Sequence, residues 1–133
     1  MPRIMLVEDN SETRHAAIEV LQRAHYEVEA CPEPRAAFAR ACQERPDLVI
    51  LDVPAHQPRV GYQVLDRLKQ QEETQAIPVL LAVPTPGALE PDQQALAERG
   101  VHVLAQPIGP TDLIQGVEDV LGPPPPELER RSL

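Results

Sequence analysis

Short, continuous apolar runs alternate along the chain with segments in which apolar side chains recur every three or four positions. Continuous runs of Val, Ile and Leu indicate strands buried on both faces, and the three-to-four spacing indicates helices with one buried face. On this basis the sequence predicts five strands, at Arg3–Val7, Tyr26–Ala30, Leu48–Leu51, Ile77–Val83 and Val101–Ala105.

Five helices are predicted between and after these strands. They begin at Asn10 or Ser11, near Pro34, at Tyr62, at Asp92 and at Pro110, and they end near His25, before Pro46, near Glu73, at Arg99 and at Leu121. Asn and Ser are favoured N-caps, and Pro suits a first helical turn. Two prolines and a glycine in residues 52–61 predict a loop without regular structure before the third helix.

Strand and helix alternation of this kind is typical of an α/β domain. We predict a single doubly wound domain over residues 3–121, with a five-stranded parallel sheet and helices on both faces. Residues 122–133 contain four consecutive prolines and few apolar side chains, and we expect them to form a disordered tail.

The net charge and the missing motifs argue against several classes of function. The formal net charge of the 133 residues is −9, which disfavours direct binding to nucleic acids or anionic membranes. No glycine-rich phosphate loop is present, and the two cysteines form no zinc-type or redox pair. The chain shows no signal peptide and no apolar run of membrane-spanning length, so we expect a cytoplasmic location.

Three carboxylates follow two of the predicted strands. Glu8 and Asp9 come after the first strand, and Asp52 comes directly after the third. The carboxyl ends of parallel strands share one edge of a sheet, so we expect these side chains to converge there. Mg²⁺, which prefers oxygen ligands, would relieve their mutual repulsion. The alternative is that they are solvated loop acids. His56, in the next loop, is a further candidate for contact with this group.

Over residues 3–121 the chain resembles the receiver domain of bacterial response regulators. The resemblance rests on Ile4-Met5-Leu6-Val7-Glu8-Asp9-Asn10, on Pro46-Asp47-Leu48-Val49-Ile50-Leu51-Asp52, on Gly61 at the third helix and on Ile77-Pro78-Val79-Leu80. It implies a flavodoxin-like fold in which Asp52 matches the aspartate that accepts a phosphoryl group from a histidine kinase. Glu8 and Asp9 match the acidic pair that helps to hold Mg²⁺.

The sequence departs from the family at its switch positions. Val83 stands where members usually carry Thr or Ser, Gln106 where they carry Lys, and Val103 where they carry an aromatic residue. Thr85 is a candidate substitute for the missing hydroxyl, although prolines on both sides restrict it. After Asp52 the loop is about one residue longer than usual, and Pro54 falls where a backbone carbonyl normally completes the metal shell.

We therefore expect a stand-alone, atypical receiver or pseudo-receiver that signals through protein contacts and for which phosphorylation is weak or dispensable. The alternatives are a conventional response regulator phosphorylated on Asp52 and, third, a small flavodoxin-like enzyme or ligand-binding protein. We expect no enzymatic activity. The expected partners are a histidine kinase or a downstream signalling protein. A homodimer through the fourth helix, fifth strand and fifth helix is a further expectation, with Leu96, Val103, Leu113 and Val117 on that face or in the core.

Overall fold

A five-stranded parallel sheet forms the centre of the protein. In the computed structural model, which describes residues 1–84 and 93–123, the strand order is β2-β1-β3-β4-β5. The bounds are β1 Arg3–Val7, β2 Glu27–Cys31, β3 Leu48–Asp52, β4 Val79–Val83 and β5 Val101–Ala105. The predicted α/β class and doubly wound sheet are confirmed, and β2 lies at an edge as its weaker apolar pattern suggests.

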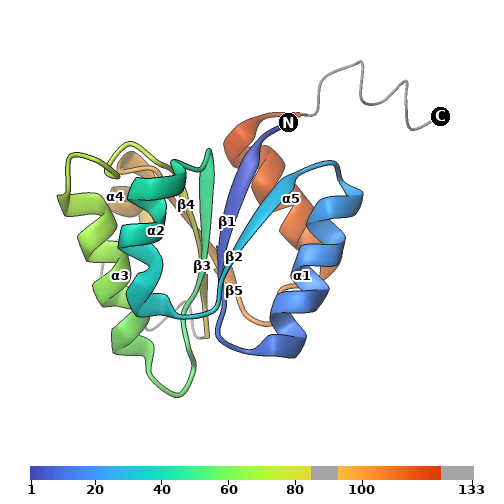
Figure 1. Ribbon diagram of the computed structural model, residues 1–133, viewed down its shortest axis with the longest axis horizontal. Coiled ribbons are helices and arrows are strands. Elements are labelled where there is room, and N and C mark those ends of the chain that lie inside the picture. The colour runs from blue at the N-terminus through green and yellow to red at the C-terminus, as the bar shows by residue number, and fades with distance from the viewer. Residues whose placement is uncertain (85–92, 124–133) are drawn as a thin grey trace.

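Helices cover both faces of the sheet (Figure 1). One face carries α1 (Ser11–Arg23) and α5 (Pro110–Leu121), and the other carries α2 (Ala37–Glu44), α3 (Pro58–Gln70) and α4 (Gln93–Glu98). Each face has its own apolar core. Leu21, Leu48 and Val117 belong to the first core, and Leu51, Leu68 and Leu81 to the second. Side chains of one strand reach opposite faces in alternation, which explains the continuous apolar runs.

Helix α3 begins earlier than predicted. The prediction of a loop through residue 61 is wrong, because α3 starts at Pro58 and Gly61 lies inside its first turn. Proline is favoured at the first helical position, where its missing N–H would have no partner in any case. The glycine is needed for packing: a Cβ atom at Gly61 would lie 3.0–3.1 Å from atoms of Val53.

Helix α3 also ends earlier than predicted, at Gln70 and not near Glu73. Two buried polar side chains hold the turns that follow it. Thr74 donates its hydroxyl to the Leu68 carbonyl at 2.7 Å, and the Lys69 ammonium donates to the carbonyls of Gln75 and Ile77 at 3.1 and 2.7 Å. The first bond satisfies a carbonyl in the last turn of the helix, and the other two fix the segment that leads from the helix into β4.

The other predicted boundaries agree within a few residues. Asn10 caps α1 by accepting a hydrogen bond from the Thr13 N–H at 2.9 Å. A short 3₁₀ turn, η1 (Pro34–Ala36), precedes α2, so the proline-started helix is divided into two pieces. Strand β4 begins at Val79, two residues later than predicted, because Pro78 has no N–H to donate to the sheet.

Four apolar residues were expected either on a dimer face formed by α4, β5 and α5 or in the core. Leu96, Leu113 and Val117 are buried in the two cores, and Val103 is half-buried against one of them. These side chains are therefore mainly core residues. None of the helices among residues 1–84 and 93–123 has the length and apolar character needed to cross a bilayer. Thr85 and most of the proline-rich tail lie outside the described residues.

Candidate functional site at the carboxyl edge of the sheet

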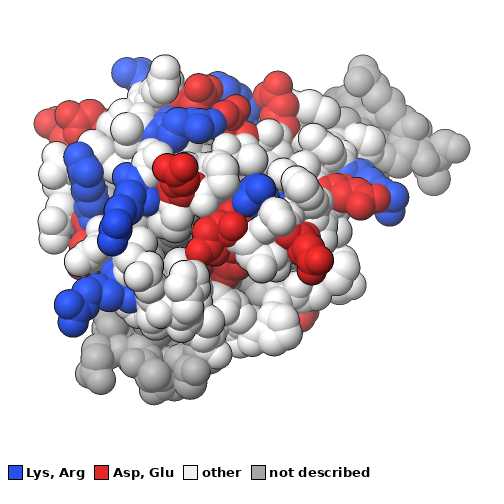
Figure 2. Space-filling model, turned by 60° about the horizontal axis from the view of Figure 1, so that its bottom comes forward, with Lys and Arg blue, Asp and Glu red and all other residues white. Residues whose placement is uncertain are grey.

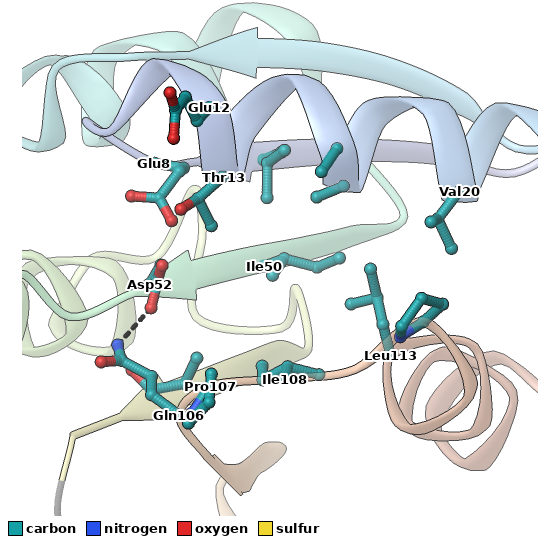
Figure 3. A pocket seen from close by; sticks show the side chains of 15 residues that line it. Glu8, Glu12, Thr13, Val20, Ile50, Asp52, Gln106, Pro107, Ile108 and Leu113 are labelled. Atoms are coloured by element: carbon teal, nitrogen blue, oxygen red, sulfur yellow. Dashed lines mark hydrogen bonds between the residues drawn. The ribbon is translucent and has the colours of Figure 1, made fainter.

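The parallel sheet brings the candidate residues to one edge. Glu8 follows β1, Asp52 is the last residue of β3, and Gln106 follows β5. All three line a hollow of about 350 Å³, and Figure 3 shows Glu8, Asp52 and Gln106 side by side at the ends of their strands. Asp9 and His56 line the same hollow. The predicted convergence of Glu8, Asp9 and Asp52 at this edge is therefore present in the structure.

Glu8 and Asp52 are in direct contact. Glu8 is almost fully buried, at 4% exposure, and its carboxyl group shares a hydrogen bond with the Asp52 carboxylate. Burial, together with the neighbouring Asp52 charge, raises the pKa of Glu8 to about 9. Burial also raises the pKa of Asp52 above its ordinary value, opposed by hydrogen bonds from Glu8 and Gln106. One proton shared between two carboxylates relieves the repulsion that two charges would cause.

Gln106 holds Asp52 from the opposite side. Its side-chain amide nitrogen donates to an Asp52 carboxylate oxygen, a bond drawn as a dashed line in Figure 3. The same nitrogen lies 2.9 Å from the Val53 carbonyl oxygen and 3.1 Å from the Ala82 carbonyl oxygen. An amide nitrogen has two hydrogens, so its donor capacity is fully used by these three acceptors. The contact contributes no positive charge to the site.

Asp9 and His56 lie further out in the same hollow. The His56 Nε2 atom is 3.9 Å from an Asp9 carboxylate oxygen, and the His56 side chain is 70% exposed. The two residues thus meet at the solvent side of the hollow, in the place that the sequence suggested for His56. An exposed pair at this separation is worth little to stability.

The residues present fit a divalent cation in part. Among residues 1–84 and 93–123, no three His, Cys, Asp or Glu side chains are grouped tightly enough to ligate an ion together. Glu8 and Asp52 are nevertheless paired carboxylates with no cationic side chain between them, and Asp9 borders the same hollow. Mg²⁺ commonly uses one or two carboxylates and completes its shell with water. Glu8 and Asp52, with Asp9 through small adjustments, are therefore a suitable donor set.

The backbone carbonyl of Pro54, which the sequence places in the metal shell, already has one hydrogen-bond partner. The carbonyl oxygen accepts a hydrogen bond from the Gln57 N–H at 3.1 Å, within the turn that leads into α3. A carbonyl oxygen has two lone pairs, so one remains for another partner. Pro54 itself is buried beneath the hollow that it helps to line.

The switch positions have apolar surroundings. Val83 is completely buried in the core beneath α2, α3 and α4 and lines neither hollow that borders Asp52. Val103 packs half-buried against the same core. Val83 therefore has no hydroxyl to offer, and its methyl groups pack in this core. Nothing in the described residues bears on the substitute role predicted for Thr85.

Two features of the site were not found by sequence reasoning. Thr13, in the first turn of α1, lines the acidic hollow, because the Asn10 cap starts that helix beside Glu8. A second, mainly apolar hollow of about 520 Å³ continues from Asp52 between α1 and α5, with Ala17, Ile50 and Leu113 among its walls (Figure 3). The N-cap signal at Asn10 locates Thr13 in hindsight, whereas the apolar hollow depends on helix packing.

Comparison with known families agrees with this geometry. Residues 4–118 match the model of the response regulator receiver domain. The chain belongs to this family. It is a receiver domain of two-component signalling, and the family is a signalling family and not a catalytic one. Receiver domains typically bind Mg²⁺ in the active site and interact with histidine kinases and downstream effectors.

Individual relatives cover different parts of their own chains. The chain is 34% identical over 107 residues to the protein-glutamate methylesterase/protein-glutamine glutaminase 1 of Anaeromyxobacter dehalogenans, covering 80% of this chain but 30% of that protein. It is 28% identical to the polar-differentiation response regulator DivK of Brucella anthropi, covering 92% of this chain and 98% of DivK. The chain thus spans under a third of the methylesterase and nearly all of DivK.

A solved receiver structure shares the fold. The receiver domain of the sensor histidine kinase PA1611 from Pseudomonas aeruginosa, with a magnesium ion coordinated in its active-site cleft, aligns with a TM-score of 0.72. The alignment covers 92% of this chain and 98% of that domain at 23% identity. This likeness establishes the common architecture of the sheet and its helices.

Proposed function

We propose that this protein is an atypical receiver that transmits signals through protein–protein contacts, and that phosphorylation of Asp52 is slow or dispensable for its signalling. The observation that carries the proposal is the neutral Gln106 amide bonded to Asp52, where the family has a lysine. The presence of Glu8, Asp9 and Asp52 supports a preserved cation-binding site. The replacement of the family's lysine by Gln106 supports a weakened response to a phosphoryl group.

The neutral charge of Gln106, compared with the positive charge of a lysine, is the reason to expect a weak response to phosphorylation. A phosphoryl group on Asp52 would bring negative charge next to Glu8 and Asp9, and a cationic donor would stabilise both the transfer and the product. Hydrogen bonds to charged partners contribute about 1.5–3 kcal/mol, against about 1 kcal/mol for neutral ones. Gln106 therefore supplies a weaker interaction, and Val83 supplies no hydrogen bond at all.

Glu8 and Asp52 would hold Mg²⁺ in this proposal, with Asp9 at the solvent side of the hollow. When bound, the ion neutralises carboxylate charge and orients a phosphodonor for transfer to Asp52. Glu8 must first release the proton that it shares with Asp52. Gln106 keeps one Asp52 oxygen fixed, which leaves the other oxygen to face the hollow.

The expected partners are proteins of the same signalling class, either a histidine kinase or a downstream protein. The likeness to the response regulator DivK over nearly its whole length supports a place in this signalling class. The proposal includes a homodimer through α4, β5 and α5. The apolar residues expected on that face are mostly buried, so polar contacts would have to hold such a dimer.

A conventional phosphoacceptor role for Asp52 is the second candidate. The observation that favours it is that Asp52 remains partly exposed and borders the hollow beside Glu8. A carboxylate in that position is open to a phosphodonor. The two candidates differ in whether phosphorylation changes partner binding.

The test is incubation with Mg²⁺ and acetyl phosphate, or with beryllofluoride, followed by intact mass and partner affinity. Asp52→Asn serves as the matched control. We expect slow or substoichiometric modification and the same partner affinity for wild type and Asp52→Asn. A stoichiometric adduct that changes partner affinity, absent in Asp52→Asn, would establish the conventional role and refute the atypical one.

A further inference from the structure

A second candidate surface lies away from the carboxyl edge of the sheet, between η1, α2 and the outer face of α3. A groove of about 270 Å³ runs there, with Phe38, Val60 and Val64 as its apolar floor. Arg35 borders the groove from η1, and Gln63 and Arg67 border it from α3. None of these residues belongs to the hollow around Asp52.

Basic side chains are concentrated around this groove. Arg59 lies one helical turn before Gln63, and Gln63 lies one turn before Arg67, so the three form one row along α3. Figure 2 shows basic side chains along the left-hand side of the molecule, which is the side of α2 and α3 in Figure 1. This local charge is opposite to the net charge of −9.

These arginines are not used in internal ion pairs. Within the described part of the chain, Arg35, Arg59 and Arg67 form no salt bridge, whereas Arg3, Arg23 and Arg40 each pair with a glutamate. Acidic residues outnumber basic ones by 21 to 12 in the chain, so partners for arginine are not scarce. The three guanidinium groups are exposed and available to an external anion.

Arg67 is held in a defined position. Its guanidinium carbon lies 4.2 Å from the centroid of the Phe38 ring. Stacking on an aromatic ring reduces the freedom of the arginine and leaves the edge of its planar fork free to donate two hydrogen bonds to a carboxylate. An ordered arginine next to an apolar floor is suited to a ligand that is both acidic and apolar.

We propose that this groove, defined by Arg35, Phe38, Val60, Val64 and Arg67, docks an acidic protein segment that carries an apolar side chain between its carboxylates. The carboxylates would pair with Arg35 and Arg67, and the apolar side chain would cover Phe38 and the two valines. A groove of this size takes one or two side chains. Long polyanions are disfavoured, because the acidic remainder of the protein repels them.

The test is an NMR titration of the full-length, ¹⁵N-labelled protein with unlabelled peptides. The probe is Ac-Glu-Glu-Leu-Glu-Glu-NH₂, and the comparison peptides replace Leu by Ser or every Glu by Lys. We expect the acidic Leu peptide to shift the amide signals of Phe38, Val64 and Arg67. We expect the Ser peptide to bind several-fold more weakly, and the Lys peptide to cause no shift at this groove.

The variant Arg35→Glu/Arg67→Glu is expected to lower the affinity for the acidic Leu peptide at least tenfold. Arg23→Glu/Arg99→Glu changes the net charge equally at exposed positions away from the groove, and it is expected to stay within twofold of wild type. The amide spectrum of each free variant confirms its fold. Equal loss in both variants would reduce the effect to net charge and overturn the proposal.

Competitors distinguish other occupants. A single-stranded DNA 20-mer and vesicles containing phosphatidylglycerol are added in separate titrations. We expect neither to shift the signals of the groove at concentrations where the peptide saturates it. Stronger binding of DNA or vesicles than of the peptide, or no peptide binding at the groove, would refute a protein-docking surface. These results are independent of phosphorylation at Asp52.

Discussion

Gln106 donates its side-chain amide to the Asp52 carboxylate across the carboxyl edge of the sheet. The two residues are far apart in sequence, and β4 lies between their strands. The bond places a neutral donor beside Asp52, the residue that we propose as the phosphoacceptor. With Glu8 on the other side, Asp52 is held by hydrogen bonds from two uncharged groups at neutral pH.

Gln106→Lys is expected to accelerate modification of Asp52 by acetyl phosphate in the presence of Mg²⁺. A charge-assisted donor exceeds a neutral one by about 0.5–2 kcal/mol, which corresponds to a rate increase of about 2- to 30-fold. The measurement is the rate of adduct formation by intact mass. Gln106→Met, which keeps the length but removes the donor, should not exceed wild type. A rate in Gln106→Lys equal to wild type would show that Gln106 does not limit the chemistry.

Glu8→Gln is expected to change the pH dependence of stability. The pKa of Glu8 is raised from about 4.5 to about 9, so between these values the unfolded chain releases a proton that the folded protein retains. The free energy of unfolding of wild type therefore falls as pH rises from about 4.5, and the loss is complete above about 9. Gln carries no such proton and removes this slope.

Urea denaturation of Glu8→Gln and wild type without divalent cations, at pH 5 and pH 8.5, measures this effect. We expect Glu8→Gln to exceed wild type by about 1–3 kcal/mol at pH 8.5, the usual scale for a poorly compensated buried group, and by much less at pH 5. Glu72→Gln, at an exposed position after α3, serves as the control and should follow the wild-type profile. Parallel profiles for Glu8→Gln and wild type would contradict the raised pKa.

Mg²⁺ is expected to raise the melting temperature, and more so at higher pH. A dissociation constant of about 1 mM would give about 1.4 kcal/mol of stabilisation at about 10 mM Mg²⁺. Binding must displace the shared proton of Glu8 and Asp52, so apparent affinity should increase from pH 6 to pH 9. Differential scanning fluorimetry measures the shift, and Asp52→Asn should largely abolish it. The absence of any shift across this pH range would contradict Mg²⁺ binding by these acids.

Gly61→Ala is expected to destabilise the fold and disturb the residue next to Asp52. The added Cβ would lie 3.0–3.1 Å from Val53, including its Cα atom, so either α3 or the backbone after β3 must move. Overpacking costs about 1–3 kcal/mol, of which about 1 kcal/mol is offset by the better helix propensity of Ala.

Thermal or urea unfolding of Gly61→Ala gives the magnitude, and the Mg²⁺ response reports on Asp52. Gly109→Ala is a suitable control, because no atom lies within 4 Å of a Cβ at that position. Gly61→Ala/Val53→Ala should recover part of the Mg²⁺ response, since it removes the crowding methyl groups. Wild-type stability and Mg²⁺ response in Gly61→Ala would show that α3 adjusts without moving the site.

The sequence by itself determined the order and type of the main elements, because continuous apolar runs and helical spacing depend on which faces are buried. The run Leu48 to Leu51 is fully buried on both sides, as its composition predicts. The same logic placed Glu8, Asp9 and Asp52 at one edge, since parallel strands share the direction of their carboxyl ends. The family followed from the motifs around these acids.

Only the tertiary structure decided how the acids and their neighbours interact. The proton shared by Glu8 and Asp52 depends on burial, and the Gln106 bond depends on strand order, neither of which local sequence specifies. The close packing of Gly61 in α3 against Val53 is likewise not revealed by a count of prolines and glycines. Local pattern encodes which residues are buried, whereas side-chain contacts arise between segments that meet only after folding.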